Sequence, residues 1–311
     1  MSRILQAYSI DLGIAIIATI TFAVVPLVSQ DEFLMNTLIT VMLFALFGAS
    51  WDLQYGVTGL INLGPGVAYG VGGFALNYLA VQQHYAPALS LLLAGLIAAP
   101  SGLIIWLPAV RMSGAYLAIV TLAILLLAGN LALIKTGQEG YSNGIRYFSV
   151  SITTAYYGAL VVSLVGIFVL FFFKNSRFGL RSRAIKDDEV SAKARGINVA
   201  LNKLVVVVLS SFFLGLAGAY YALYTNSVNY SVFSITTNFI GITIGVIGGP
   251  GTIVGGIIGS LLVEIPSSYL VSYGVYSLIV YGLTLVIVML FFKGGVIQAL
   301  HWVARTATRI K

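Results

Sequence analysis

Side chains that could do chemistry are scarce in this chain, and half of its cations gather in one stretch. Residues 174–203 read KNSRFGLRSRAIKDDEVSAKARGINVALNK and hold eight of the sixteen Lys and Arg residues and three of the nine acids. The whole chain is 59% hydrophobic and only 8% charged, whereas soluble domains are about 25% charged. Recognition or chemistry by charged groups must therefore be sought first in this stretch.

The order of charges inside the stretch predicts a short helix. The three acids 187–189 would occupy its first turn, with Lys193 and Arg195 in its last turn, as the helix dipole favours. Glu189 and Lys193 are spaced for a side-chain pair, and Gly196 stands where a left-handed C-terminal cap is needed.

Two interpretations of this helix are open. It could be a solvated connector with ordinary cations, or a folded helix on the membrane surface that a soluble partner grips. Val190, Ala194 and Ile197 would lie on one side, opposite the charges. The sequence of acids first, bases last and a final glycine favours the second interpretation.

Other kinds of site lack suitable residues in this sequence. There is no G-x-x-x-x-G-K-[ST] phosphate loop, no cysteine, and no visible Ser/His/Asp set. His84 and His301 lie far apart with no carboxylates nearby, so we expect no metal, no cofactor and no enzymatic activity of the chain itself. The net charge of +7 suits an anionic membrane surface better than nucleic acid.

The elements that must position the charged stretch are membrane helices. Apolar runs of about twenty residues can cross the hydrocarbon layer, and they predict a single-domain (1–311), all-α polytopic membrane protein with about eight full spans. We predict spans at 10–28, 34–51, 65–82, 87–109, 114–134, 155–173, 202–224 and 269–292. Lys/Arg-rich short loops stay in the cytoplasm, so 174–203 and the basic tail 293–311 are both expected there.

That placement requires an even number of crossings between the two basic segments. Two spans already lie between them, so segment 237–264 should enter and leave on the same, outer side. A re-entrant pair of half-helices or a tight hairpin would satisfy this. Its glycines recur every four residues on either side of Pro250, as in closely approaching membrane helices.

A second glycine-rich stretch, residues 55–74, is likewise interrupted by a proline. Two such interrupted segments in different parts of a chain are typical of a midplane binding site in a transporter. The alternative, that the small residues only pack helices, is equally open. The candidate residues for a translocation path or hinge are Asn62, Gly64, Gly66, Tyr69, Gly248, Gly249, Pro250 and Gly251.

Charged and polar groups near the span ends also have alternative interpretations. We interpret Asp52 and Glu264 as anchors or interhelical partners before ion-coupling groups. The polar outer loop 135–154 is either a spacer or a docking surface for an external substrate-delivering protein. Since deeply buried ionisable groups are scarce, a pump driven by a partner subunit fits better than one driven by an ion gradient.

Several stretches resemble a known family, the permease subunits of ABC importers for branched-chain amino acids, and within it the M-type. The strongest match is 183–204 (RAIKDDEVSAKARGINVALNKL), followed by 211–224 and 245–262; 59–79 and 136–145 match more weakly. In that family the first stretch is the coupling segment seated in a cleft of the ATPase subunits.

Carried over to this chain, the family's coupling pattern falls on Asp188, Glu189, Ala192 and Gly196. Ser191 replaces an alanine that is usual there. Gly64-Pro65-Gly66 replaces the Gly-His-Ala-like step often found in relatives, which leaves the details of substrate contact open.

The resemblance implies a multi-pass permease of the cell membrane that moves branched-chain amino acids inward. Its implied partners are a second permease, two cytoplasmic ATPases that bind the ATP, and an extracytoplasmic solute-binding protein. Permeases of the same family for urea, short amides or other amino acids remain alternatives. So do a gradient-coupled secondary transporter or channel dependent on Asp52 or Glu264, and a non-transporting scaffold.

Overall fold

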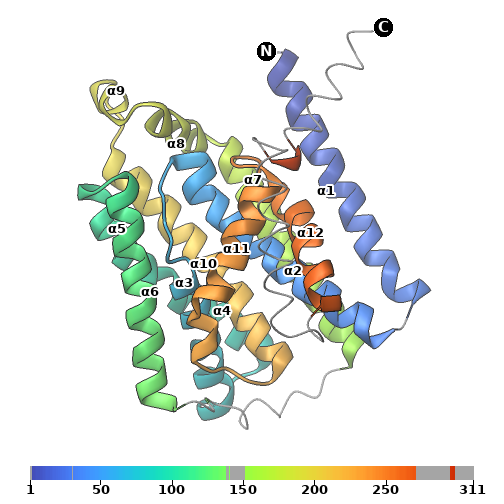
Figure 1. The fold of residues 1–311 in the computed structure, drawn as a ribbon. Coiled ribbons are helices and arrows are strands. Elements are labelled where there is room, and N and C mark those ends of the chain that lie inside the picture. The colour runs from blue at the N-terminus through green and yellow to red at the C-terminus, as the bar shows by residue number, and fades with distance from the viewer. Residues whose placement is uncertain (1, 30, 138–139, 141–150, 271–294, 298–311) are drawn as a thin grey trace, which may run out of the picture.

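The computed structural model describes residues 2–29, 31–137, 140, 151–270 and 295–297. Within these ranges the chain is a bundle of helices without a β-strand (Figure 1). The predicted span 269–292, most of the tail 293–311 and most of the outer loop 135–154 lie outside the described residues.

Five helical segments of the described residues are long and apolar enough to cross a membrane. Two of them are composite, because a π-helical or 3-10 turn continues one helix into the next. Their parts are α2 (Glu32–Asp52) with η1 (Leu53–Val57), α4 (Pro87–Ala98) with η3 (Ala99–Ser101) and α5 (Gly102–Arg111), α6 (Gly114–Thr136), α7 (Ile152–Asn175) and α10 (Val199–Thr225).

The remaining helices pack around these segments or lie at one end of the bundle. They are α1 (Ser2–Val28), α3 (Gly66–Asn77) with η2 (Tyr78–Gln82), α8 (Arg177–Asp187), α9 (Glu189–Ala194), η5 (Tyr230–Phe233), α11 (Ile235–Gly248) and α12 (Gly255–Leu270).

The class of all-α polytopic membrane protein is confirmed, but the count of eight full spans is not. Within α1, the stretch Gly13–Val28 is an apolar helix. The predicted span 65–82 consists of the twelve-residue α3 and five π-helical residues, which is short for a helical crossing of about 30 Å.

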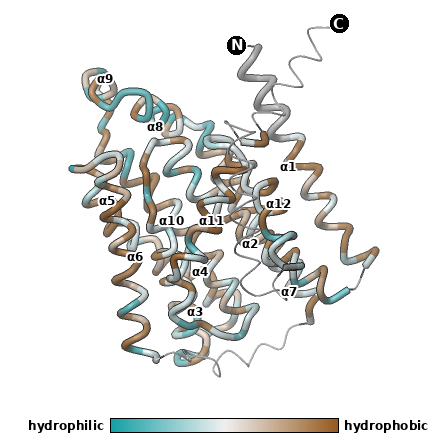
Figure 2. Tube along the Cα trace, in the orientation of Figure 1, coloured by the Kyte–Doolittle hydropathy of each residue, from teal (hydrophilic) through white to brown (hydrophobic). Residues whose placement is uncertain are grey.

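Two helices form the centre of the bundle. α2 packs against α7, α10, α11 and α12, and α10 packs against α3, α4 and α5. α1 and α6 lie at opposite edges (Figure 1). Hydrophilic residues are concentrated on α8 and α9 at one end of the bundle, while the spanning helices are mostly apolar (Figure 2).

The crossing of α3 and α10 depends on glycine. A Cβ atom on Gly218 would lie 1.9 Å from the carbonyl oxygen of Tyr69, and one on Gly72 would lie 2.0 Å from that of Gly215. Backbone atoms cannot yield as the tip of a flexible side chain can, so these glycines set the distance between the two helices.

We expect Gly218→Ala to destabilise the protein by about 2 kcal/mol, because the added methyl group forces the two backbones apart. Gly13→Ala is the matched control, since nothing lies within 4 Å of its added Cβ and alanine favours the helix. Thermal unfolding in detergent measures both. Equal melting temperatures for the two variants would contradict the close crossing.

The glycine-broken segment 237–264 forms a hairpin of α11 and α12. The two helices touch closely at the turn, where a Cβ on Gly248 would lie 2.1 Å from the carbonyl oxygen of Gly255. α12 also runs along α2 in the opposite direction. Tyr269 contacts Phe33 at the start of α2, with ring centroids 5.1 Å apart, and Ile253 contacts Asp52 at its end.

This geometry confirms that both ends of the segment lie on one side, and it favours a deep hairpin over half-helices. Since α12 follows α2 along its length, the hairpin tip reaches the end of the bundle that carries α8 and α9 (Figure 1). Gly295, two residues into the basic tail, lies against Gly249 at this tip. The start of the tail and α8 are therefore at the same end, as the crossing argument predicted.

Candidate coupling and translocation site

The charged stretch folds into two helices, α8 and α9, instead of one. Asp187 is the last residue of α8 and not, as predicted, part of the first turn of α9. The chain breaks at Asp188, which is extended (φ −159°, ψ 111°) and accepts a 2.9 Å hydrogen bond from the backbone N–H of Val190. This residue therefore serves as the N-terminal cap of α9.

Most predicted local contacts of α9 are confirmed. Glu189 and Lys193 form an ion pair of 3.0 Å, and Gly196 has the left-handed φ of +79° expected of a C-terminal cap. The predicted apolar side is confirmed for Ile197, which packs against the buried cluster, but is wrong for Val190, which is 76% exposed. Ala192 instead faces inward, against Ile185 and Val199.

Glu189 fastens α9 to the spanning helices. Its carboxylate accepts a 2.9 Å hydrogen bond from Lys203 of α10, whose Nζ also donates to the carbonyl oxygen of Ala109 near the end of α5. Lys203 is only 3% exposed, so this contact is shielded from water. Partial burial opposes ionisation of Glu189, but the hydrogen bonds and charges of Lys203 and Lys193 lower its pKa.

Asp188 is held in the charged form in a different way. A hydrogen bond from the Ser191 hydroxyl, together with backbone N–H donors at the start of α9, lowers the pKa of this exposed carboxyl. Both acids of the predicted coupling pattern are thus ionised at neutral pH. They are set at the N-terminal end of α9, where the helix dipole favours negative charge.

α8 is fastened to the bundle at a second place. The ammonium group of Lys186 donates a 2.6 Å hydrogen bond to the carbonyl oxygen of Gly56 in η1. Gly56 is where η1 meets the hairpin tip, since a Cβ there would lie 2.1 Å from the backbone nitrogen of Gly251. A displacement of α8 would therefore act directly on the junction between η1 and the hairpin.

The junction is held by one carboxylate. Asp52, only 2% exposed, accepts hydrogen bonds from the backbone N–H groups of Gly251 at 2.7 Å and Ile253 at 2.9 Å. We call Asp52, Gly56, Gly251 and Ile253 the tip clasp. Ile253 has a φ of +56°, which is strained for a β-branched residue. The prediction that Asp52 is an interhelical partner is confirmed.

Residues between η1 and α3 form the second broken segment, and side chains satisfy its backbone. The backbone carbonyl oxygen of Asn62 accepts a 2.7 Å hydrogen bond from the indole N–H of Trp51. Its side-chain amide donates to Gln54, and its side-chain oxygen accepts from the backbone N–H of Gly64, each at 2.8 Å. Asn62 thus faces protein, as predicted, and keeps this segment unwound.

Asn238 of α11 completes this segment from the other side. Its side chain accepts from the N–H of Gly66 at 2.8 Å and donates to the carbonyl oxygen of Leu63 at 2.9 Å. The hydroxyl of Thr121 in α6 accepts from the N–H of Leu63 at 2.9 Å. Non-helical backbone at membrane depth requires such partners, because lipid offers none.

Gln54, Thr121 and Asn238 were not among the predicted site residues, although the structure brings them to the unwound segment. A lone polar residue in an otherwise apolar helix is the signal that could have identified each of them. Their partners could not be identified, since Gly66 and Asn238 are 172 positions apart.

We expect Asn238→Ala to cost about 1–2 kcal/mol, because it leaves the N–H of Gly66 and the carbonyl of Leu63 without their partner. Asn130→Ala is the control, since this exposed asparagine bonds only within its own helix. Thermal unfolding compares the two. An Asn238→Ala protein as stable as the control would show that the unwound segment does not depend on this side chain.

The predicted path residues fall into two groups joined by neighbouring residues of α2. Asn62 and Gly64 belong to the unwound segment and Gly66 begins α3, whereas residues 248–251 form the hairpin tip. Trp51 bonds to the first group and Asp52 to the second. A shift of the end of α2 would consequently displace residues in both broken segments.

Tyr69, the remaining candidate, lies in the aromatic core. It is 1% exposed and packs against Phe44, Phe47 and Tyr221. Its hydroxyl has no hydrogen-bond partner among the described residues. Tyr69 therefore lies in the core, and it is not among the residues that line the groove between α4, α7 and α10.

The features above define an integral membrane protein with two broken intramembrane segments and an exposed helix pair at one end. The sequence model of the family "Branched-chain amino acid transport system / permease component" matches residues 33–289, and the chain belongs to this family. The resemblance noted from the sequence is thereby confirmed.

Two curated relatives are similar over most of the chain. The high-affinity branched-chain amino acid transport system permease protein LivM of Escherichia coli (strain K12) is 26% identical over 291 residues, covering 82% of this chain and 68% of the relative. The protein of the same name from Salmonella typhimurium (strain LT2) is 25% identical over the same shares of each chain.

Proposed function

We propose that this chain is the permease subunit of an ATP-binding-cassette importer that moves branched-chain amino acids inward across the cell membrane. Separate cytoplasmic ATPase subunits bind the ATP. The observation that carries the proposal is the folded, exposed helix α9, which Glu189 and Lys203 fasten to the spanning helices. The names of the two relatives support the substrate class.

In this proposal α9 docks in a cleft of an ATPase subunit with Asp188, Glu189, Ala192 and Gly196 shaping its fold. Closure of the ATPases moves α8 and α9 together. The movement reaches the tip clasp through the 2.6 Å hydrogen bond from the Lys186 ammonium group to the carbonyl oxygen of Gly56. From the clasp it passes along α2 to the unwound segment, where Asn62, Gly64 and Gly66 act as the hinge or line the path.

Two further partners complete the proposed assembly. A second permease would face this one across the path, and an extracytoplasmic solute-binding protein would deliver the amino acid at the end opposite α9. α6 offers a broad apolar surface for the second permease or for lipid, since Ile119, Leu127 and Ile134 are all exposed.

A gradient-coupled transporter is less well supported. Asp52, one of the two carboxylates on which that alternative depended, already accepts two backbone hydrogen bonds and has a structural task. The other, Glu264, is buried in α12. A scaffold without transport would have no use for the connection from α9 to both broken segments. Urea, short amides and other amino acids remain alternative cargoes, because the described geometry does not select among small polar solutes.

Reconstitution in vesicles tests the proposal. The chain is assembled with its second permease, ATPases and solute-binding protein, and uptake of labelled leucine is measured with ATP or with an ion gradient alone. We expect uptake that requires ATP and every subunit. Uptake by this chain alone, driven by a gradient, would refute the ATP-driven importer, and uptake of amides in place of leucine would refute only the substrate class.

A further inference from the structure

A groove of about 800 Å³ lies at the end of the bundle opposite α8 and α9. α10 forms its floor with Tyr220 and Leu223, and α4 and α7 form walls that include Leu91 and Val161, respectively. The volume is in the range of sites that enclose drug-sized ligands. Nothing in the proposed coupling pathway uses this groove.

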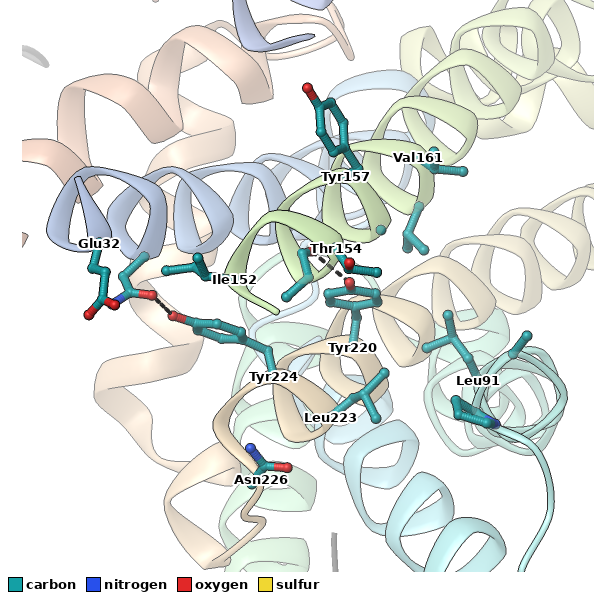
Figure 3. A pocket seen from close by; sticks show the side chains of 16 residues that line it. Glu32, Leu91, Ile152, Thr154, Tyr157, Val161, Tyr220, Leu223, Tyr224 and Asn226 are labelled. Atoms are coloured by element: carbon teal, nitrogen blue, oxygen red, sulfur yellow. Dashed lines mark hydrogen bonds between the residues drawn. The ribbon is translucent and has the colours of Figure 1, made fainter. Parts of the chain in front are cut away.

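The groove is polar at one end and apolar at the other. Figure 3 shows Glu32 and Asn226 toward one end, and Leu91 and Val161 toward the other. Glu32 begins α2 and Asn226 follows α10, so the polar end is the mouth at the bundle surface. The apolar end reaches toward the interior of the membrane layer.

The polar mouth is suited to a positively charged group. Glu32 contributes a carboxylate, and the side-chain oxygen of Asn226 has no hydrogen-bond partner among the described residues. No Lys, Arg or His is among the described residues that line the groove. The Glu32 carboxylate can accept a hydrogen bond from a primary ammonium group, whereas a ligand with only negative charge would be repelled.

The apolar walls continue into the surface that faces lipid. Val161 and Val165 on α7 are exposed, as are Leu92 and Leu96 on α4. The groove therefore opens sideways toward the bilayer between these two helices. An acyl chain can enter from the membrane without leaving an apolar environment, while its head group remains at the interface.

We propose that this groove binds an aminophospholipid of the outer leaflet, with its primary ammonium at Glu32 and one acyl chain along the floor of α10. The inference uses the membrane orientation proposed above but does not depend on the transported solute. Bound there, the lipid would fill the space between α4 and α7.

Lipid binding to the intact transporter tests this site. The complex is purified into nanodiscs of phosphatidylethanolamine and phosphatidylglycerol in equal amounts, and native mass spectrometry measures the retained lipids. We expect preferential retention of phosphatidylethanolamine. Leu91→Trp should remove it by filling the groove, whereas Leu92→Trp, at the adjacent exposed residue that does not line the groove, should retain it.

Glu32→Gln separates the head-group contact from the acyl contact. We expect the ratio of retained phosphatidylethanolamine to phosphatidylglycerol to fall about fivefold, as for an exposed ion pair. Because Glu32 is exposed, this variant should fold normally, which thermal unfolding verifies. Equal lipid retention by the two Trp variants, or no change of the ratio in Glu32→Gln, would overturn the proposal and leave only ordinary annular lipid.

Discussion

Asp52→Ala is expected to destabilise the protein by about 3 kcal/mol and to reduce ATP-driven uptake about tenfold. The substitution removes a buried carboxylate that accepts hydrogen bonds from the N–H groups of Gly251 and Ile253. Both donors would then lack a partner, and hydrogen bonds to charged groups are worth more than neutral ones. The hairpin tip would also lose the contact that holds Ile253 in its strained conformation.

Asp52→Asn separates the structural role from ion coupling. Its amide oxygen can still accept one of the two hydrogen bonds, so stability and uptake should both fall less than in Asp52→Ala. Thermal unfolding and vesicle uptake are measured on the same preparations. Loss of uptake in Asp52→Asn with unchanged stability would contradict the clasp and indicate that the carboxylate takes part in ion coupling.

Reversing the charges of α9 is expected to have the second large effect. With Asp188→Lys and Glu189→Lys, α9 loses its N-terminal cap and its ion pair with Lys203. The new lysines would also repel Lys193 and Lys203. Substrate-stimulated ATP hydrolysis by the assembled transporter should fall at least about tenfold, which is the size of a typical coupling free energy. Thermal unfolding of the same preparation checks that the variant is folded, and normal substrate-stimulated hydrolysis by a folded double variant would contradict the coupling role of α9.

A gentler variant distinguishes docking from folding of α9. Val190→Glu changes an exposed side chain but leaves the cap, the ion pairs and the left-handed Gly196 in place. If α9 docks on an ATPase through this face, hydrolysis should lose its response to substrate while the melting temperature stays constant. Normal stimulation in Val190→Glu would exclude this face from the contact.

Local features of the coupling segment were predictable because they depend on neighbouring residues. The Glu189–Lys193 pair and the cap at Gly196 follow from spacings of a few positions. The buried side of α9 was not predictable. A helix of six residues is too short for its apolar pattern to fix a face. Ala192 is buried in place of Val190 because Ala192 packs against Val199 at the start of α10.

The spanning helices and the broken segments were predictable from hydropathy and from glycine with proline. Their mutual arrangement was not. Asp52 and Gly251 are 199 positions apart, and no pattern in a single sequence indicates that two such distant residues are in contact. The predicted span 65–82 coincides with α3 and η2. It falls short of a full crossing because Asn62 and Asn238 hold apolar residues before α3 out of the helix.

We propose that α9 is the cytoplasmic contact through which ATPase subunits drive the bundle. The chain contains no cysteine, so Val190→Cys and Ile134→Cys, both at highly exposed positions, each introduce one unique thiol. In the assembled transporter, Val190→Cys should react only with reagents on the cytoplasmic side and should crosslink to an ATPase subunit, while Ile134→Cys should do neither. Labelling of Val190→Cys from outside, or its failure to crosslink to an ATPase, would contradict the account.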